Sequence, residues 1–285
     1  MLGYLYAFGA AFSTAASDAL AKQALRHHSA VVIAWVRLGY ASLFLLPLLY
    51  FVPIPELDGV FWIIIAFMLP LEICGIILYM KALQIAPMSL VVPFMSLTPV
   101  FTIVTSFFIL GELPDLMGIL GILFIVVGAF CLNIHLFREG FLQPFRSILA
   151  EKGVLLMIAV AFLYSLTSTL GKAAIQHSSP AFMGICYIPM ISLCLLPLAI
   201  RNGMRVSSLR VGGSIFFLIG ATQAIQALLH FKAISMILVS YMISVKRTSL
   251  LLSVIIGGVY FHEEHIRERL AGSLLMLLGV VLILV

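Results

Sequence analysis

The sequence contains little charge. Of its 285 residues, 9% are charged and 63% are hydrophobic, and the mean hydropathy is +1.22. Charged residues make up about a quarter of an ordinary globular domain, so a water-soluble protein of this length could not enclose so many apolar side chains. The composition therefore excludes a soluble fold, and we expect a lipid bilayer to surround most of the chain.

The alternation of apolar and polar residues that a membrane β-barrel needs in each strand of about ten residues is also missing. The apolar runs are continuous and about twice that length, which predicts helices. No hydrophilic stretch is long enough for a separate domain. The first apolar run lacks a basic segment before it and contains Asp18, so we interpret it as a retained span and not as a signal peptide.

Recognisable catalytic and metal-binding patterns are absent as well. The four cysteines show no metal or disulfide spacing, and we expect them to be small core residues. His262 and His265 lie three residues apart, whereas the zinc motif of metalloproteases needs a spacing of four. Because no nucleophile motif and no phosphate-binding loop is present, we predict neither an enzyme nor an ATP-driven pump, and neither a cofactor nor a metal site.

What the sequence does contain is a series of apolar windows of about 20 residues, each long enough to cross a hydrocarbon core of about 30 Å. These windows cover residues 3–25, 30–52, 59–82, 87–110, 115–136, 153–176, 181–200, 211–231, 235–260 and 268–285. We therefore predict an all-α membrane protein with ten transmembrane helices.

Most basic residues fall in loops on one side of the predicted bundle. Eleven of the 16 Lys and Arg residues lie in loops opposite the two termini, two lie in loops on the side of the termini, and three lie inside spans. Lys and Arg in short loops favour the cytoplasm, so this bias places both termini outside the cytoplasm. It also explains the net charge of +5 without a nucleic-acid partner.

The chain resembles itself at a shift of about 150 residues. Residues 10–50 and 160–200 are identical at 13 of 41 positions, among them Lys22/Lys172. At a shift of 151, Glu112 aligns with Glu263. Apolar identities arise by chance in such sequences, so the matched Lys, His, Glu, Pro and Gly positions carry the evidence for a duplication.

The duplication predicts two five-helix repeats, residues 1–136 and 153–285. They are joined by residues 137–152, where phenylalanines alternate with basic residues as in an interfacial segment. Five is an odd number of helices, so the second repeat must enter the membrane in the opposite sense. Two inverted repeats around a site near the midplane are the architecture of many secondary transporters.

One stretch resembles a known family. KALQIAPMSLVVPF at 81–94, LTPVF at 97–101 and LGE at 110–112 are similar to the signature of the EamA type of the drug/metabolite transporter superfamily, and the second half repeats this pattern more loosely. The resemblance covers nearly the whole chain. It implies ten helices, two EamA repeats and transport of a solute or metabolite, often export, across a bacterial inner membrane. It also implies cytoplasmic termini, which is opposite to the charge count.

The sequence departs from this pattern in the window 235–260. Where the window 87–110 has Pro93 and Pro99, this window has Ser244 and Leu250, with two adjacent cations nearby. We therefore carry over no substrate from the family. Pro93 and Pro99 remove backbone donors and should bend the predicted helix at 87–110.

Small residues recur in the last window of each repeat. Such residues allow two helices to approach closely, so these windows should hold the two halves together, with a homodimer interface as an alternative. The residues concerned are Gly121, Gly128, Gly272 and Gly279.

Polar side chains at the same depth in repeat-related helices suggest a central site. Glu72 lies near the middle of its window, and at a shift of 151 it aligns with Gln223; Gln226 shares the helix face of Gln223. Intramembrane ionisable groups are usually functional. We predict that these residues bind the substrate and that Glu72 exchanges a proton; a buried ion pair that fixes helix packing is the alternative.

Lys246 and Arg247 lie about halfway along the window 235–260. Neighbouring residues differ by about 100° around a helix, so the two side chains cannot point at the same spot. We predict that at least one of them binds an anionic part of the substrate. The alternative is an internal salt bridge to Glu72 or Asp18.

Two further charged residues lie inside spans. Asp18 has Lys22 four residues on, so an intrahelical ion pair is the simplest expectation, and a role in proton coupling is the alternative. Arg37 should extend to the basic side of the membrane or bind an anion; we include it among the substrate-binding candidates.

These observations together predict a secondary transporter that exports a small polar or anionic metabolite by alternating access, coupled to protons through Glu72. Its partners would be the solute and the bilayer. A flippase for a lipid or lipid-linked sugar is the first alternative, with a cavity that opens sideways to lipid. A membrane enzyme and a structural membrane protein are the others.

Overall fold

The computed structural model describes residues 1–86, 91–131, 151–204, 213–252 and 266–284, which are helical apart from short connections and contain no strand. The first half contains α1 (Leu2–Ala24), α2 (Ala30–Leu45), the 3-10 helix η1 (Leu46–Phe51), α3 (Gly59–Ile85), the 3-10 helix η2 (Val92–Leu97), α5 (Thr98–Leu110) and α6 (Leu116–Cys131). The second half contains α8 (Lys152–Gln176), α9 (Pro180–Arg201), α11 (Gly213–Ile234), α12 (Val239–Lys246) and α14 (Ile266–Leu284).

Five helical segments are long and apolar enough to cross a membrane: Ala30–Phe51, Gly59–Ile85, Lys152–Gln176, Pro180–Arg201 and Gly213–Ile234. Three further apolar helical stretches, Phe94–Leu110, Leu116–Gly128 and Leu274–Leu284, are shorter. The prediction of an all-α protein with membrane-spanning helices is therefore confirmed. The predicted interfacial segment falls almost entirely on residues 132–150, and the His262–His265 cluster on residues 253–265, which both lie outside the described residues.

The outer surfaces of these helices are apolar. Phe67, Phe108 and Leu193 are each more than 65% exposed. In water such a surface would be costly, whereas lipid tails are as apolar as these side chains. The cysteines also lie toward this surface: Cys74 and Cys194 are exposed, and the other two are partly exposed. The expectation that cysteines are core residues was wrong, because a lipid-facing position accepts a small apolar side chain as well as the core does.

Polar side chains cap the N-termini of helices at positions where the sequence predicts that these helices start. The hydroxyl of Ser29 accepts the N–H of Val32 at the start of α2, and the hydroxyl of Ser179 accepts the N–H of Phe182 at the start of α9. Each side chain satisfies a backbone donor that the first turn of a helix leaves unpaired. These caps account for why the predicted boundaries at residues 30 and 181 agree closely with the observed ones.

The two prolines predicted to bend the fourth helix lie at the starts of two consecutive helical elements. Pro93 lies in the first turn of η2, and Pro99 in the first turn of α5. A proline fits a first turn because the N–H it lacks would have no partner there. In residues 91–110, the described part of the segment predicted at 87–110, a 3-10 helix is followed directly by an α-helix. The prolines inside helices are instead Pro70 in α3, and Pro189 and Pro197 in α9.

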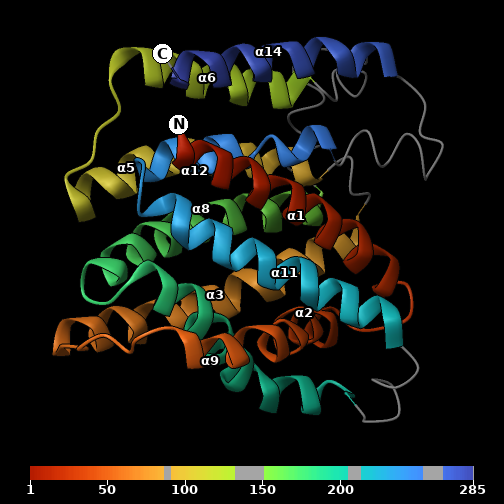
Figure 1. The fold of residues 1–285 in the computed structure, drawn as a ribbon. Coiled ribbons are helices and arrows are strands. Elements are labelled where there is room, and N and C mark those ends of the chain that lie inside the picture. The colour runs from red at the N-terminus through yellow and green to blue at the C-terminus, as the bar shows by residue number, and fades with distance from the viewer. Residues whose placement is uncertain (87–90, 132–150, 205–212, 253–265, 285) are drawn as a thin grey trace.

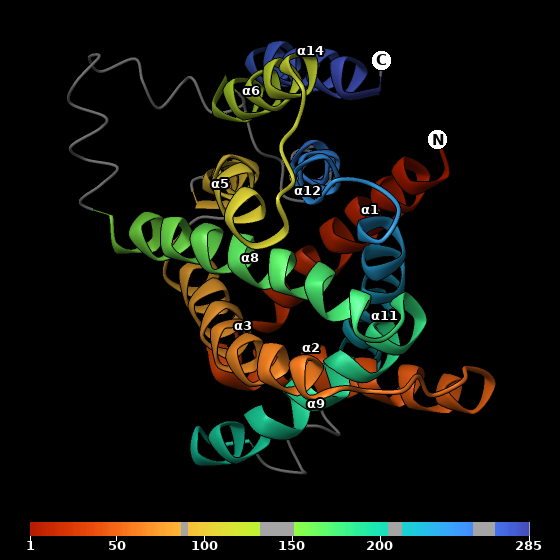
Figure 2. The same cartoon turned by 90° about the vertical axis from the view of Figure 1, so that its left-hand side faces the viewer.

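The helices form layers that follow the repeat. Figure 1 and Figure 2 show α6 beside α14 at one edge, α5 and α12 in the next layer, and α2 and α9 at the opposite edge. These are contacts between corresponding helices of the two halves. Between the edges, α1 of the first half packs against α11 of the second, and α8 of the second half packs reciprocally against α3 of the first. Such an exchange of partners is what a two-fold relation between the halves produces.

The glycine contacts between α6 and α14 show the relative direction of these two helices. A methyl group at Gly121 would lie 2.6 Å from the carbonyl oxygen of Gly279, and one at Gly128 would lie 2.7 Å from the carbonyl oxygen of Gly272. Because the partner number falls as the residue number rises, the two helices are antiparallel. These two corresponding helices of the repeats therefore run in opposite directions, and their close contact lies within one chain.

The lysines matched by the repeat make matching contacts. Lys22, near the end of α1, donates to the carbonyl oxygens of Leu83 and Ala86 at the end of α3. Lys172, in the last turns of α8, donates to the carbonyl oxygen of Ile237 just after α11. Lys22 thus satisfies carbonyls that the C-terminus of α3 leaves unpaired and meets the negative end of that helix dipole, and Lys172 binds a carbonyl in the connection that follows α11.

A polar cluster joins the two halves at the end of the bundle where α5 and α8 finish. The carboxylate of Glu112, in the connection after α5, forms an ion pair with Lys172 of α8. Its second oxygen accepts the backbone N–H of Val239 at 3.1 Å, at the first residue of α12. Glu112 therefore ties two helices of the second half to the first.

Asp115 makes a second connection at the same end. Its carboxylate accepts the N–H of Gly118 at 2.7 Å, as the cap of α6, and the hydroxyl of Tyr241 at 2.8 Å. These hydrogen bonds, the backbone one first, lower the pKa of Asp115 below its ordinary value. A carboxylate whose pKa is lowered by folding stabilises the fold while it is ionised, and this contribution disappears as the pH falls through the folded-state pKa.

We expect the Asp115→Ala variant to melt about 1–2 °C below the wild type at pH 7, and by a smaller margin at an acidic pH below the lowered folded-state pKa of Asp115, where the wild-type carboxyl is protonated. Thermal unfolding in detergent at both pH values measures this difference. Asp115→Asn is the matched control, because asparagine caps a helix equally well and cannot titrate. An alanine variant as stable as the wild type at both pH values would contradict the cap.

Candidate functional site

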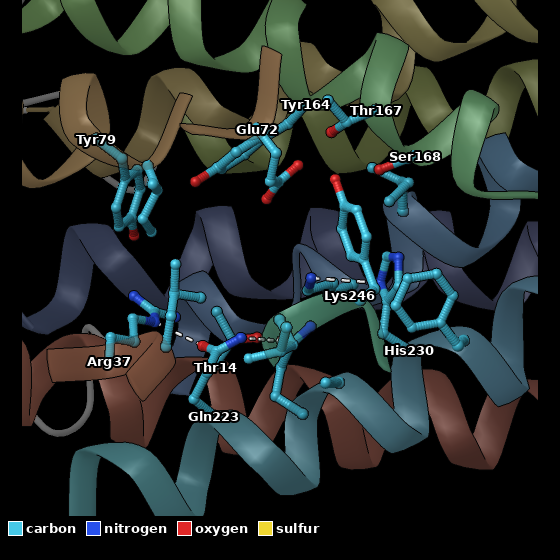
Figure 3. A pocket seen from close by; sticks show the side chains of 18 of the residues that line it. Thr14, Arg37, Glu72, Tyr79, Tyr164, Thr167, Ser168, Gln223, His230 and Lys246 are labelled. Atoms are coloured by element: carbon cyan, nitrogen blue, oxygen red, sulfur yellow. Dashed lines mark hydrogen bonds between the residues drawn. The ribbon is translucent and has the colours of Figure 1, made fainter. Parts of the chain in front are cut away.

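A polar cavity lies between the two halves, at the centre of the helices. The cavity is lined by every site residue that was predicted within the spans apart from the two prolines, together with polar residues that were not predicted (Figure 3). The predicted residues that line it are Asp18, Arg37, Glu72, Gln223, Gln226, Lys246 and Arg247. They come from α1, α2, α3 and α11, and from α12 and the residue that follows it. Residues up to about 230 positions apart in sequence thus meet at one site.

The charged group best satisfied in the cavity is the carboxylate of Asp18, which is 3% exposed. One oxygen accepts NH1 of Arg37 at 2.7 Å, and the other accepts the hydroxyl of Tyr79 at 2.7 Å. Two predictions are corrected here. Asp18 does not pair with Lys22, because Lys22 lies at the helix end and binds the carbonyls of α3. Arg37 does not extend to the membrane surface, because it is buried against Asp18.

The amide side chains of α11 extend this cluster into the second half. Nε of Arg37 donates to Oε1 of Gln223 at 2.6 Å, and the Gln223 amide donates to Oε1 of Gln226 at 2.8 Å. Buried polar groups that are fully paired hold a single arrangement, since any change leaves one of them without a partner. The row from Asp18 to Gln226 is therefore a fixed wall of the cavity.

Glu72 lies across the cavity from this wall. It is partly exposed and lines the cavity together with Thr167 of α8. The described residues place no cation within 4 Å of its carboxylate, although Lys246 and Arg37 interact with it electrostatically at longer range. Figure 3 shows Glu72 and Lys246 on facing sides of the cavity. The predicted ion pair between Lys246 or Arg247 and Glu72 or Asp18 does not form among the described residues.

Lys246 and Arg247 point to different neighbours, as their adjacent positions on a helix predict. Nζ of Lys246 lies 3.5 Å from Nδ1 of His230 on α11, whereas NH2 of Arg247 donates to the hydroxyl of Thr98 on α5 at 3.0 Å. α12 ends at Lys246, and Arg247 forms its C-cap, so the continuous helix predicted at 235–260 is interrupted here. Both cations line the cavity without a carboxylate within 4 Å among the described residues.

Buried donors without a partner are rare in native proteins, and each costs about 1–3 kcal/mol. In the part of the chain that the structure describes, three side-chain atoms are of this kind: Oγ of Ser17, the hydroxyl of Tyr187 and Nε of Arg247. Tyr187 and Arg247 both line the cavity. Hydrogen-bonding capacity that the protein does not use is thus concentrated at this site.

Several polar residues of the cavity were not predicted from sequence. Thr14, Tyr164, Thr167, Ser168 and Tyr187 line it. Hydroxyl side chains are common in membrane helices and carry no charge that would mark them, so single positions gave no signal. The repeat does give a signal at two of these positions. Tyr187 aligns with Arg37 of the first half, and Ser168 aligns with Asp18.

The size of the cavity limits its occupant. Its volume is about 120 Å³, which holds on the order of ten water molecules at roughly 10–15 Å³ for each. A solute of similar size has about ten non-hydrogen atoms. Over the described ranges, no three His, Cys, Asp or Glu residues cluster as metal ligands.

Comparisons with known proteins agree with this architecture. The sequence model of the EamA-like transporter family matches residues 1–134 and again residues 151–285. A solved crystal structure of a protein aligns with 98% of this chain and 95% of its own, with a TM-score of 0.73 at 15% sequence identity, a similarity that shows the fold alone. No curated protein matches the sequence.

Helices with apolar outer faces, two related halves and a polar cavity between them define a membrane transporter. The chain belongs to the EamA-like transporter family, whose model matches it twice and covers nearly all of its length. It is therefore an integral membrane protein of the drug/metabolite transporter type. The members of this family are transporters and not enzymes.

Proposed function

We propose that the protein is a secondary transporter that exports a small anionic metabolite by alternating access between its two halves. The observation that carries this proposal is the pair of cavity cations, Lys246 and Arg247, that no described carboxylate neutralises. A charge inside a membrane costs at least about 2.5–3.5 kcal/mol, so uncompensated cations at a cavity are expected to meet an anion. The carboxylate or phosphate of the solute supplies it.

The proposal includes ten transmembrane helices as two inverted five-helix repeats. The antiparallel pairing of α6 and α14 supports the inversion, and the five long apolar segments with three shorter apolar helices support the helix count. It also includes a bacterial inner membrane as the location, with both termini outside the cytoplasm, on the strength of the eleven basic residues in loops on the other side. We propose that the chain has no enzymatic activity.

Lipid and lipid-linked substrates form the second candidate class, because a Lys/Arg pair also suits a phosphate headgroup. The volume of about 120 Å³ favours a small solute over a lipid. Binding of soluble anions in detergent, measured by thermal shift, separates the two classes. Stabilisation by phospholipid alone, with none by small carboxylates or phosphates, would favour the flippase.

Glu72 is the proposed coupling residue. Asp18 is the other candidate, but both of its oxygens are engaged by Arg37 and Tyr79, whereas Glu72 lines the cavity without a cation within 4 Å among the described residues. A carboxylate that faces the solute and can take up a proton is able to couple the movement of the solute to the movement of protons.

We expect Glu72→Gln to lower solute-driven proton movement by about 10-fold or more, because the amide cannot carry a proton between the two sides. The measurement is a pyranine signal in proteoliposomes after addition of small carboxylates and phosphates. Glu56→Gln, which alters an exposed carboxylate in the connection before α3, is the matched control and should behave as the wild type. Proton movement by Glu72→Gln at the wild-type rate would contradict the coupling role.

A further inference from the structure

Most of the residues that line the cavity fall into pairs related by the repeat. The pairs at its two ends are Asp18/Ser168, Arg37/Tyr187 and Tyr79/His230. Figure 3 shows Arg37 and Tyr79 at one end of the cavity, with Ser168 and His230 at the other. The cavity therefore lies on the two-fold relation between the halves, and its two ends can be compared group by group.

The end formed by the first half is filled by its own side chains. Arg37 binds Asp18 at 2.7 Å, Tyr79 donates to the same carboxylate, and Arg37 also reaches across to Gln223. Every hydrogen bond in this cluster joins two groups of the protein. A solute could contact this end only by breaking an ion pair between buried groups.

The end formed by the second half lacks this pair. Ser168 replaces the carboxylate and Tyr187 replaces the guanidinium, so no ion pair can form between them. The Tyr187 side chain is 3% exposed, and its ring packs against Phe231 with centroids 5.8 Å apart. Its hydroxyl has no hydrogen-bond partner among the residues that the structure describes. The Tyr187 ring thus packs as a phenylalanine ring would, and its hydroxyl makes no hydrogen bond with the described residues.

We propose that Tyr187 is a substrate-binding residue, and that the solute places a polar group beside Tyr187 and Ser168, at the position where the first half holds its own Asp18–Arg37 pair. This inference rests on the proposed function, in which Lys246 and Arg247 bind the anionic group. α11, which carries His230, packs against both α9 and α12. A solute that reaches both Tyr187 and Arg247 extends along α11.

The chemical class follows from these two contacts. One end of the solute is a carboxylate or phosphate, and the other carries a hydroxyl or carbonyl group that accepts the Tyr187 hydrogen bond. About ten non-hydrogen atoms fit the cavity. Small hydroxy or oxo acids, and phosphate esters of small polyols, have this composition.

The experiment compares probe pairs that differ in one hydroxyl group: lactate with propionate, malate with succinate, and glycerol 3-phosphate with 3-hydroxypropyl phosphate. Dissociation constants come from thermal shift titrations of the purified wild type, Tyr187→Phe and Tyr79→Phe. In the wild type, the hydroxylated member of at least one pair should bind about 10-fold more tightly, since a site built to bond a hydroxyl penalises its absence. In Tyr187→Phe the two members should bind equally, and the melting temperature without ligand should not fall.

Tyr79→Phe is the matched control, because it removes the hydroxyl that Asp18 uses. It should melt below the wild type and keep the preference for the hydroxylated probe. If Tyr187→Phe keeps that preference, or melts several degrees below the wild type, the inference is wrong while the proposed function stands. If no pair is discriminated by the wild type although its members bind, the inference is equally wrong. If no probe stabilises the wild type, the proposed anion site fails, and the inference fails with it.

Discussion

Replacing Asp18 by alanine is expected to destabilise the protein by about 3–5 kcal/mol, the usual effect of removing one partner of a buried ion pair. The carboxylate accepts Arg37 on one oxygen and Tyr79 on the other, and the residue is 3% exposed. Without it, a guanidinium and a phenol remain buried with fewer acceptors. In detergent the melting temperature should fall by roughly 10 °C.

A double-mutant cycle tests whether this loss comes from the pair. Asp18→Asn combined with Arg37→Gln leaves two amides of similar size that can hydrogen-bond to each other without charge. The double variant should be more stable than the sum of the single variants predicts, because neither charge is left alone. Additive effects, or an Asp18→Ala variant that melts within about 2 °C of the wild type, would show that the pair does not hold α1 to α2.

The sequence predicted the composition of the cavity better than its connections. Glu72, Gln223 and Lys246 could be placed together because each is a costly polar group at mid-depth in an otherwise apolar helix, and such groups converge where lipid is absent. This argument needs only depth and periodicity. The repeat added the correspondence between Glu72 and Gln223 and, through the odd number of helices, the inversion that the glycines of α6 and α14 display.

The partner of each charge could not be predicted, because it depends on which helix faces which. Asp18 had a cation four residues away, but Lys22 lies close enough to the end of α1 to reach the free carbonyls of α3. Arg37 faces α1 from α2 and takes the carboxylate instead. The spacing of Asp18 and Lys22 predicts the most favourable ion pair for an isolated helix. In the structure, packing among α1, α2 and α3 gives each of the two residues a different partner.

The boundaries of helices likewise could be predicted where they depend on local sequence and could not where they depend on packing. Where a side chain caps a helix, as Ser29 and Ser179 do, the start could be read from sequence. The interruption after Lys246 carries no proline or glycine that would mark it, and the C-cap there is Arg247, whose side chain reaches Thr98 on α5. A break of that kind depends on tertiary contacts, which no window of hydropathy contains.

The cavity thus has two kinds of charge, and they should respond to mutation in opposite ways. The Asp18–Arg37 pair is satisfied by the protein, so its removal costs stability. Arg247 donates to Thr98, and its Nε has no partner in the described part of the chain, so the protein gains little from its charge when no solute is bound. Functional residues of this type are often retained at a cost in stability.

We expect Arg247→Met to bind the anionic probes about 30- to 5000-fold more weakly than the wild type, because a charge pair with a buried anion contributes about 2–5 kcal/mol. The same variant should melt at or above the wild-type temperature, since an apolar side chain of similar length replaces an uncompensated buried charge. Thr98 keeps its hydrogen bond to the carbonyl oxygen of Met95, so the substitution leaves no new unpaired group. Arg247→Lys is the matched control: it retains the charge without the planar fork, and its affinity should fall between the other two. Thermal shift titrations measure stability and affinity in one experiment. A methionine variant that melts well below the wild type and still binds the probes would identify Arg247 as a structural cation and place the anion site elsewhere in the cavity.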